Sequence, residues 1–141
     1  MHSKVIRIAG LAAGAIAALF GGWTPGLTIL SVMMAVDYLT GVLVAITGKS
    51  PKSAGGGLSS KAGFTGIARK GFIMLIVLVA TQLDAAIGRE LFKSLTVFYY
   101  IANEGLSILE NAERMGVPTP AVLRKRLETM RDGDQKGNGE I

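Results

Sequence analysis

The sequence contains no cysteine and a single histidine, His2, in 141 residues. Without cysteine the chain can form neither a disulfide framework nor a thiolate metal site. It also has no nucleophile–base–acid set, no cluster of metal ligands and no cofactor-binding loop. Acidic residues that could act as paired carboxylates lie in apolar segments, out of reach of an extended glycan. The sequence therefore predicts a protein that is not an enzyme and that binds no cofactor.

Charge is also scarce over long stretches. Half of the residues are hydrophobic and 18% are charged, and the apolar residues form long blocks that a soluble fold would interrupt. This pattern predicts an all-α membrane protein: a small bundle of three to four transmembrane helices followed by a short cytoplasmic amphipathic helix. We divide it into a Gly/Ala-rich apolar segment (1–23), a transmembrane core (24–112) with a basic loop (48–70), and a basic tail (113–141).

The apolar block 27–48 has the length of a membrane span and one charge, Asp37, at its middle. About 20 helical residues cross the hydrocarbon layer, which is roughly 30 Å thick. An ionised carboxylate at its centre costs about 2.5–3.5 kcal/mol, so Asp37 should face protein or water and not lipid. Thr40 and Gly41 share that face. Two interpretations stay open: a hydrogen bond that fixes helix packing, or a position lining an assembly face or aqueous path.

The first apolar block, 8–23, is short for a span and rich in small residues. Gly10, Gly14, Ala18 and Gly22 recur every four residues, a spacing typical of close packing between membrane helices. A parallel stripe of small residues lies beside it. A signal peptide is the alternative, because a basic start precedes the block. We expect a first span with a helix-packing stripe.

Two further blocks, 71–88 and 95–111, are predicted to span the membrane, the first with Asp84 near its far end. The basic loop before them contains Pro51, three consecutive glycines and five lysines or arginines without an acid, which predicts a flexible segment. The block 95–111 carries a polar stripe on one side, so it is poorly suited to stand alone in lipid. The stripe and its margin consist of Asn103, Glu104, Ser107, Glu110 and Asn111.

The tail has a helix signal, with Thr119 as cap and Pro120 at the first position. Arg124, Lys125 and Arg126 make that helix basic enough to lie on anionic lipid, although a solvated tail is the alternative. Gly133 should end it, and residues 134–141 should be disordered. Thirteen of the fifteen lysines and arginines fall on one side if all four blocks cross. This asymmetry predicts that both termini are cytoplasmic, and it argues against nucleic acid as the partner of the basic residues.

Small and polar residues recur in a definite order from about residue 37 to residue 127. They are Asp37-Tyr38-Leu39-Thr40-Gly41, Ser59-Ser60, Gly63, Gly66-Ile67, Arg69-Lys70, Asp84, Phe98-Tyr99-Tyr100-Ile101-Ala102-Asn103-Glu104, Ser107-Ile108, Glu110-Asn111, Gly116, Pro118 and Pro120. This order resembles the toxin-secretion and phage-lysis holins. The resemblance implies a multi-span inner-membrane protein that forms homo-oligomeric lesions and releases an endolysin, or in some relatives a toxin, at a timed moment. It implies no stable contact with that cargo, and an antiholin as a further partner.

On this hypothesis several polar and small positions mediate oligomerisation or line the pore. They are Asp37, Thr40, Gly41, Asp84, Asn103, Glu104, Ser107, Glu110 and Asn111. The cytoplasmic mouth would be formed by Ser59, Ser60, Gly63, Gly66, Arg69 and Lys70. Of the acids on the last helix, Glu110 is predicted to be the better partner for Arg69 and Lys70. The rival functions are a small ion channel or transporter, with the acids as ion sites, and a membrane subunit or antiholin without a pore of its own.

Overall fold

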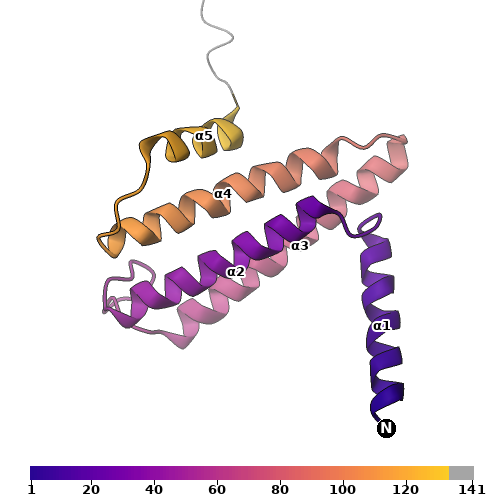
Figure 1. Ribbon diagram of the computed structural model, residues 1–141, viewed down its shortest axis with the longest axis horizontal. Helices are drawn as coiled ribbons and strands as arrows, with labels where there is room; N and C mark the ends of the chain where they lie inside the picture. Colours follow the sequence, from indigo (N-terminus) through magenta and orange to yellow (C-terminus); the bar gives the residue numbers. More distant parts are fainter. Residues whose placement is uncertain (134–141) are drawn as a thin grey trace, which may run out of the picture.

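The computed structural model describes residues 1–133 and shows an all-helical chain, with no strand in that range. Five helices follow one another: α1 (His2–Leu19), α2 (Pro25–Ile46), α3 (Ser60–Ile87), α4 (Phe92–Arg114) and α5 (Ala121–Asp132). Helices α2, α3 and α4 lie side by side, α5 lies along the outer side of α4, and α1 leads away from the others (Figure 1). The predicted disorder of 134–141 lies outside the described residues.

The core of the bundle is apolar and small. Leu27 and Leu30 of α2 and Val77 of α3 are completely buried, and Val97 of α4 packs with them. Glycine allows α4 to approach closely at this end, since a Cβ on Gly26 would lie 3.3 Å from Cγ1 of Val97. Burial of these aliphatic side chains, each stabilising by about 1.5–3 kcal/mol, fixes the order of the three helices.

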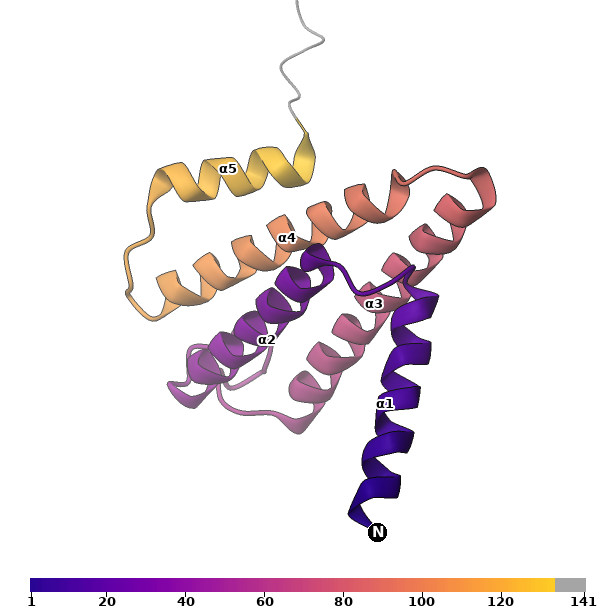
Figure 2. The ribbon, with the colours of Figure 1, turned by 45° about the vertical axis from the view of Figure 1, so that its right-hand side comes forward.

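Helix α1 touches the bundle only near its C-terminal end. None of its residues is buried, whereas Phe20, directly after it, belongs to the core. Both ribbon views show α1 extending away from α2, α3 and α4 (Figure 2). Gly22 lies beyond the helix in a turn, with φ of 93°, so the predicted stripe has only three members on α1. A Cβ added to Gly10 or Gly14 would have no neighbour within 4 Å, so that face has no partner within the described chain.

Helix α3 begins earlier than the sequence predicts. The flexible loop expected over 48–70 ends at Ser59, whose side chain accepts a hydrogen bond from the Ala62 amide at 3.3 Å and so caps the helix. The prediction of a loop was therefore wrong for residues 60–70. With 28 residues at about 1.5 Å each, α3 is longer than the roughly 30 Å hydrocarbon layer.

The tail helix differs from the prediction at its start. Pro120 is the N-cap of α5, and Thr119 instead donates a hydrogen bond to Oε1 of Glu113 at 2.8 Å. Gly133 ends the helix in a positive-φ conformation, as predicted. Leu127 packs against Gly105 of α4, so α5 is docked on the bundle.

Three helices in the described part of the chain are long and apolar enough to cross a membrane: α1, α2 and α3. Helix α4, predicted as a fourth span, is not among them. The reason is the polar stripe of that helix, which includes the buried Glu104 and Asn111. Helix α4 therefore needs protein or water on several of its sides.

Candidate functional site

A buried ionic cluster joins the three bundle helices. The Nζ of Lys70 on α3 lies 2.6 Å from Oδ2 of Asp37 on α2 and 2.6 Å from Oε2 of Glu104 on α4. The exposed fractions of the side chains are 17% for the lysine and 8% and 5% for the two acids. One cation therefore bridges two carboxylates that come from different helices. Buried charges are tolerated only when paired in this way, so the cluster selects this arrangement of α2, α3 and α4.

An amide extends the cluster on the α4 side. The Nδ2 of Asn111 lies 2.9 Å from the hydroxyl of Thr40 and 3.3 Å from both the backbone oxygen and Oδ1 of Asp37. Thr40 in turn donates to the backbone oxygen of Val36 or Asp37 on its own helix. The described chain leaves no buried side-chain polar atom without a hydrogen-bond partner. The polar side of α2 is thus satisfied within one chain.

Glycines allow α2 and α3 to approach near the cluster. A Cβ on Gly63 would lie 3.3 Å from the hydroxyl of Tyr38, and a Cβ on Gly66 would lie 3.4 Å from its ring. The Tyr38 ring therefore lies against the part of α3 that lacks side chains. A bulky side chain at Gly63 or Gly66 would crowd the Tyr38 ring.

A pocket of about 130 Å³ opens beside the cluster. Its lining combines the ionic residues with side chains of the 47–59 connection and the start of α3. Among the lining residues are Asp37, Gly41, Ser50, Lys52, Ser59, Gly63, Gly66, Arg69, Lys70, Asn103, Glu104, Ser107 and Asn111. The described residues contain no group of three or more His, Cys, Asp or Glu side chains placed to hold a metal ion. The pocket has both polar and apolar lining and is large enough for a few water molecules.

The second buried aspartate, Asp84, has a different environment. Its carboxylate accepts hydrogen bonds from three successive backbone amides at the start of α4: Leu91 (3.1 Å), Phe92 (2.7 Å) and Lys93 (3.0 Å). These amides have no partner inside the helix, and the positive end of the helix dipole favours the carboxylate. Asp84 therefore caps α4 from the end of α3 and fixes the tight connection between them.

The same end of the bundle holds the chain segment that follows α1. The ammonium of Lys93 donates to the backbone oxygen of Phe20 and lies 3.4 Å from that of Gly22, and Nε2 of Gln82 donates to Leu19 at 2.9 Å. Carbonyl oxygens at a helix C-terminus lack intrahelical partners, so the lysine and the glutamine satisfy them. These contacts attach the end of α1 to α3 and α4.

The structure brings together most of the residues singled out from the sequence. Asp37, Thr40, Glu104 and Asn111 are in direct contact through the cluster, while Asn103 and Ser107 line its pocket. The preference for Glu110 as the partner of Arg69 and Lys70 was wrong. Lys70 pairs with Glu104, whereas Glu110 is exposed and lies 4.0 Å from Arg114, one turn further along α4.

Three contributors to these contacts do not emerge from the sequence pattern. Tyr38 enters it only as part of a motif, and the pattern assigns no partner to Gln82 or Lys93. Each of the three contacts a glycine or a backbone carbonyl oxygen that lies more than 20 positions away in the sequence. The sequence offers one signal for these contacts: Lys93 lies in the short connection between two predicted spans. By itself, a lysine at such a position indicates only membrane orientation.

Beyond this geometry, most of the chain resembles known proteins. The model of the bacteriophage holin family matches residues 14–132, which include the ionic cluster, the Asp84 cap and α5. The chain belongs to the bacteriophage holin family. Its relatives include a probable holin of Bacillus phage phi105, 38% identical over 112 residues that cover 78% of each chain.

Other relatives come from bacterial genomes. An uncharacterized protein of Clostridium perfringens is 40% identical over 114 residues, covering 79% of each chain. The uncharacterized protein YqxH of Bacillus subtilis is 36% identical over 113 residues, covering 79% of this chain and 75% of that one. No solved structure matches the chain. Family membership identifies the chain as a membrane protein with a holin role in host lysis, and not as an enzyme.

Proposed function

We propose that this holin oligomerises in the bacterial cytoplasmic membrane and forms lesions through which an endolysin, or a toxin, leaves the cell at a timed moment. Family membership supports the holin role. The single structural observation that supports assembly is the contrast between the outside and the inside of the bundle. Helices α2 and α3, both of membrane-spanning length, present apolar side chains outward along most of their length and bury Asp37 and Asp84, while Lys61 and Arg69 near the start of α3 are exposed.

The outer faces of α2 and α3 suit contact with lipid or with another copy of the chain. Large apolar side chains are exposed along both helices: Ile29, Val32, Leu39, Leu43, Ile46, Phe72, Leu75, Val79, Leu83 and Ile87. In water such a surface would be far larger than soluble monomers expose. In a bilayer it costs nothing, and the unpartnered small residues of α1 add a surface on which a second helix can pack closely.

For the orientation we propose cytoplasmic N- and C-termini with four crossings, in which α4 is admitted to the membrane by its contacts with α2 and α3. The basic residues of the N-terminus, the connection before α3 and the tail then share the cytoplasmic side, opposite Arg89 and Lys93. A three-span chain, with α1 cleaved or lying on the surface, keeps the same orientation from α2 onward.

The same proposal gives the buried polar residues a role in assembly. In one chain Asp37, Glu104 and Asn111 satisfy their hydrogen-bonding groups through Lys70 and one another, so they stabilise a compact protomer. For these side chains to line a lesion or contact another copy, the helices would have to separate first. The energy of the ionic cluster would then set part of the delay before lesions form. An antiholin could act by stabilising the compact protomer.

The test is induced expression in a bacterial host with and without an endolysin. We expect growth to continue and then stop abruptly with loss of membrane potential, followed by lysis only when the endolysin is present. Vesicles containing the purified protein should release a folded protein of endolysin size. Leakage of ions alone would instead favour a small channel, and sealed vesicles at every dose would contradict a pore. Asp37→Asn and Glu104→Gln should change the time of lysis, and unchanged timing with unchanged oligomer size would remove both from the mechanism.

A further inference from the structure

Helix α5 lies alongside the bundle, level with a helix long and apolar enough to cross a membrane, although its own surface is strongly charged. Its Leu127 contacts α4 at Gly105, where a Cβ would lie 3.1 Å from both Cδ atoms of the leucine. The same Cβ position is 3.1 Å from Cε of Met33, which belongs to the middle part of α2. Leu127 is therefore level with the middle of a helix whose composition matches the hydrocarbon layer.

The helix also reaches far along α4. At its start, Arg124 pairs with Glu113 near the end of α4, at 2.5 Å. Near its other end, Met130 lines a groove of about 850 Å³ together with Val97 and Ile101, close to the beginning of α4. Figure 1 shows α5 running back along α4, away from the connection that joins them. Twelve helical residues cover about 18 Å, more than half of the hydrocarbon thickness.

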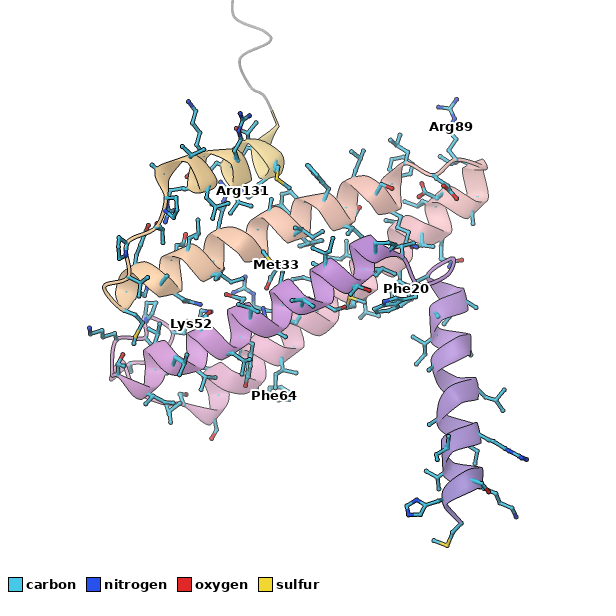
Figure 3. All side chains as sticks on the ribbon, viewed as in Figure 1. Phe20, Met33, Lys52, Phe64, Arg89 and Arg131 are labelled. Atoms are coloured by element: carbon cyan, nitrogen blue, oxygen red, sulfur yellow. The ribbon has the colours of Figure 1, made fainter. Side chains whose placement is uncertain are left out.

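From Lys125 to Asp132, the outward side of α5 is incompatible with lipid. Its exposed positions include Lys125, Arg126, Glu128, Thr129 and Asp132. Figure 3 shows side chains of α5 pointing away from α4, on the side of the molecule opposite α3. Charged groups at membrane depth require protein or water around them. By contrast, the outward sides of α2 and α3 are apolar, with Leu39 and Phe72 both more than 60% exposed. The protomer thus has a lipid-compatible side and an opposite, water-demanding side.

We propose that the charged face of docked α5 lines a water-filled lumen that is enclosed by several copies of this chain. This inference rests on the proposed function and names the element that faces the lumen. A single protomer cannot enclose water at membrane depth, so the partners that complete the lumen are further copies, each presenting its own α4–α5 pair inward and its α2–α3 face to lipid. Asp37 and Glu104 remain inside the protomer in this arrangement, while Lys125 and Arg126 reach water without separation of the helices.

Because the chain has no cysteine, a single introduced cysteine is the only thiol that can be labelled. The protein is assembled in vesicles and treated with a membrane-impermeant maleimide. Cysteine should react rapidly at Lys125→Cys and at Glu128→Cys. Leu39→Cys on the lipid-compatible side should react slowly, and Lys49→Cys in the connection before α3 serves as the accessible control. Protection of both α5 positions in the assembled protein would overturn the proposal.

Accessibility alone does not separate a lumen from the cytoplasmic surface, so docking is measured as well. Gly105→Cys with Leu127→Cys should form a disulfide that ties α5 to α4, and the oxidised protein should still release a folded cargo protein from vesicles. Release that appears only after reduction would show that α5 must leave α4, and it would overturn the proposal. If that pair does not fold, spin labels at Ser94→Cys and Met130→Cys, two positions that line the same groove, replace it. A short distance between them in the assembled protein supports docking, and a distance that lengthens on assembly contradicts it.

The proposed function and the α5-lined lumen can fail separately. Cargo release by the chain without cysteines tests the proposed function alone. If that release is absent while the disulfide forms and Lys125→Cys remains reactive, the water-facing α5 stands and the release of a folded protein is wrong. If release occurs but α5 is undocked or protected, the holin function stands and the lumen is lined by another element.

Discussion

The helical bundle buries one aspartate midway along α2 and another near the end of α3, and it satisfies the two in opposite ways. Asp37 is held by side chains from two other helices, through Lys70, which is 33 residues away, and Asn111, which is 74 residues away. Asp84 is held by backbone amides only seven to nine residues further along the chain. The first environment depends on the packing of all three helices, and the second on one tight turn. Breaking the first should separate helices, whereas breaking the second should loosen a single helix end.

The largest effect is expected when the cation of the ionic cluster is removed. Lys70→Ala leaves two buried carboxylates without a counter-charge, and removal of one partner of a buried ion pair costs about 3–5 kcal/mol. We expect that loss in the free energy of unfolding, measured by denaturant titration in detergent. Arg69→Ala is the matched control, since Arg69 is the exposed neighbour on the same helix. Equal stability of the two variants would mean that the cluster contributes nothing to packing.

A smaller and more local effect is expected at Asp84. Asp84→Ala removes the acceptor of three amides, so the first turn of α4 should fray while the Lys70 bridges persist. Hydrogen exchange should accelerate at residues 91–93 and remain slow around Glu104. Glu90→Ala is the control, because Glu90 is exposed in the same turn. Faster exchange around Glu104 as well as at residues 91–93 would show that the two environments are coupled and that the contrast between them is false.

Removal of the lysine that attaches α1 should have less effect on the bundle. Lys93→Ala deletes the donors to the Phe20 and Gly22 carbonyl oxygens but leaves the backbone amide that donates to Asp84. A spin label on α1 should become more mobile, while the midpoint of thermal unfolding of α2, α3 and α4 changes little. A marked drop in that midpoint would show that α1 is part of the core and not an attached arm.

The smallest effect concerns pH and the docking of α5. Glu113 lies beyond the predicted span 95–111, where Arg124, with help from the Thr119 hydroxyl, lowers the pKa of its carboxyl below the ordinary value of 4.5. A carboxyl whose pKa is depressed in the folded state stabilises that state above its ordinary pKa and loses this contribution as the pH falls through the folded value. Docking of α5 should therefore weaken only below about pH 4.5. Energy transfer between labels on α4 and α5 measures this docking.

Glu113→Gln provides the comparison for that titration. It should weaken docking slightly at neutral pH and abolish the acid-dependent change, because the amide does not titrate. An acid transition of the same size in the variant would assign it to another group.

The sequence predicted the elements of the fold better than their contacts. The spans around Asp37 and Asp84 were recognised because long apolar runs with one acid have few other interpretations. The start of α3 was missed because glycines and serines over 53–66 indicate a loop, yet Ser59 caps a helix whose glycines are needed for Tyr38. The pairing of Lys70 with Glu104 could not be derived, since it depends on the relative depth of two helices that the sequence does not specify.

The most direct test of the ionic cluster is an exchange of charges. Asp37→Lys and Lys70→Glu, each alone, place like charges together and should lower the midpoint of thermal unfolding and the amount of protein in the membrane. Made together with Glu104→Gln, so that no second carboxylate lies beside Lys70→Glu, the double variant again pairs one cation with one carboxylate and should recover most of both. If both single variants unfold at the wild-type temperature, or if the double variant is no better than the worse single one, the cluster does not hold the three helices together.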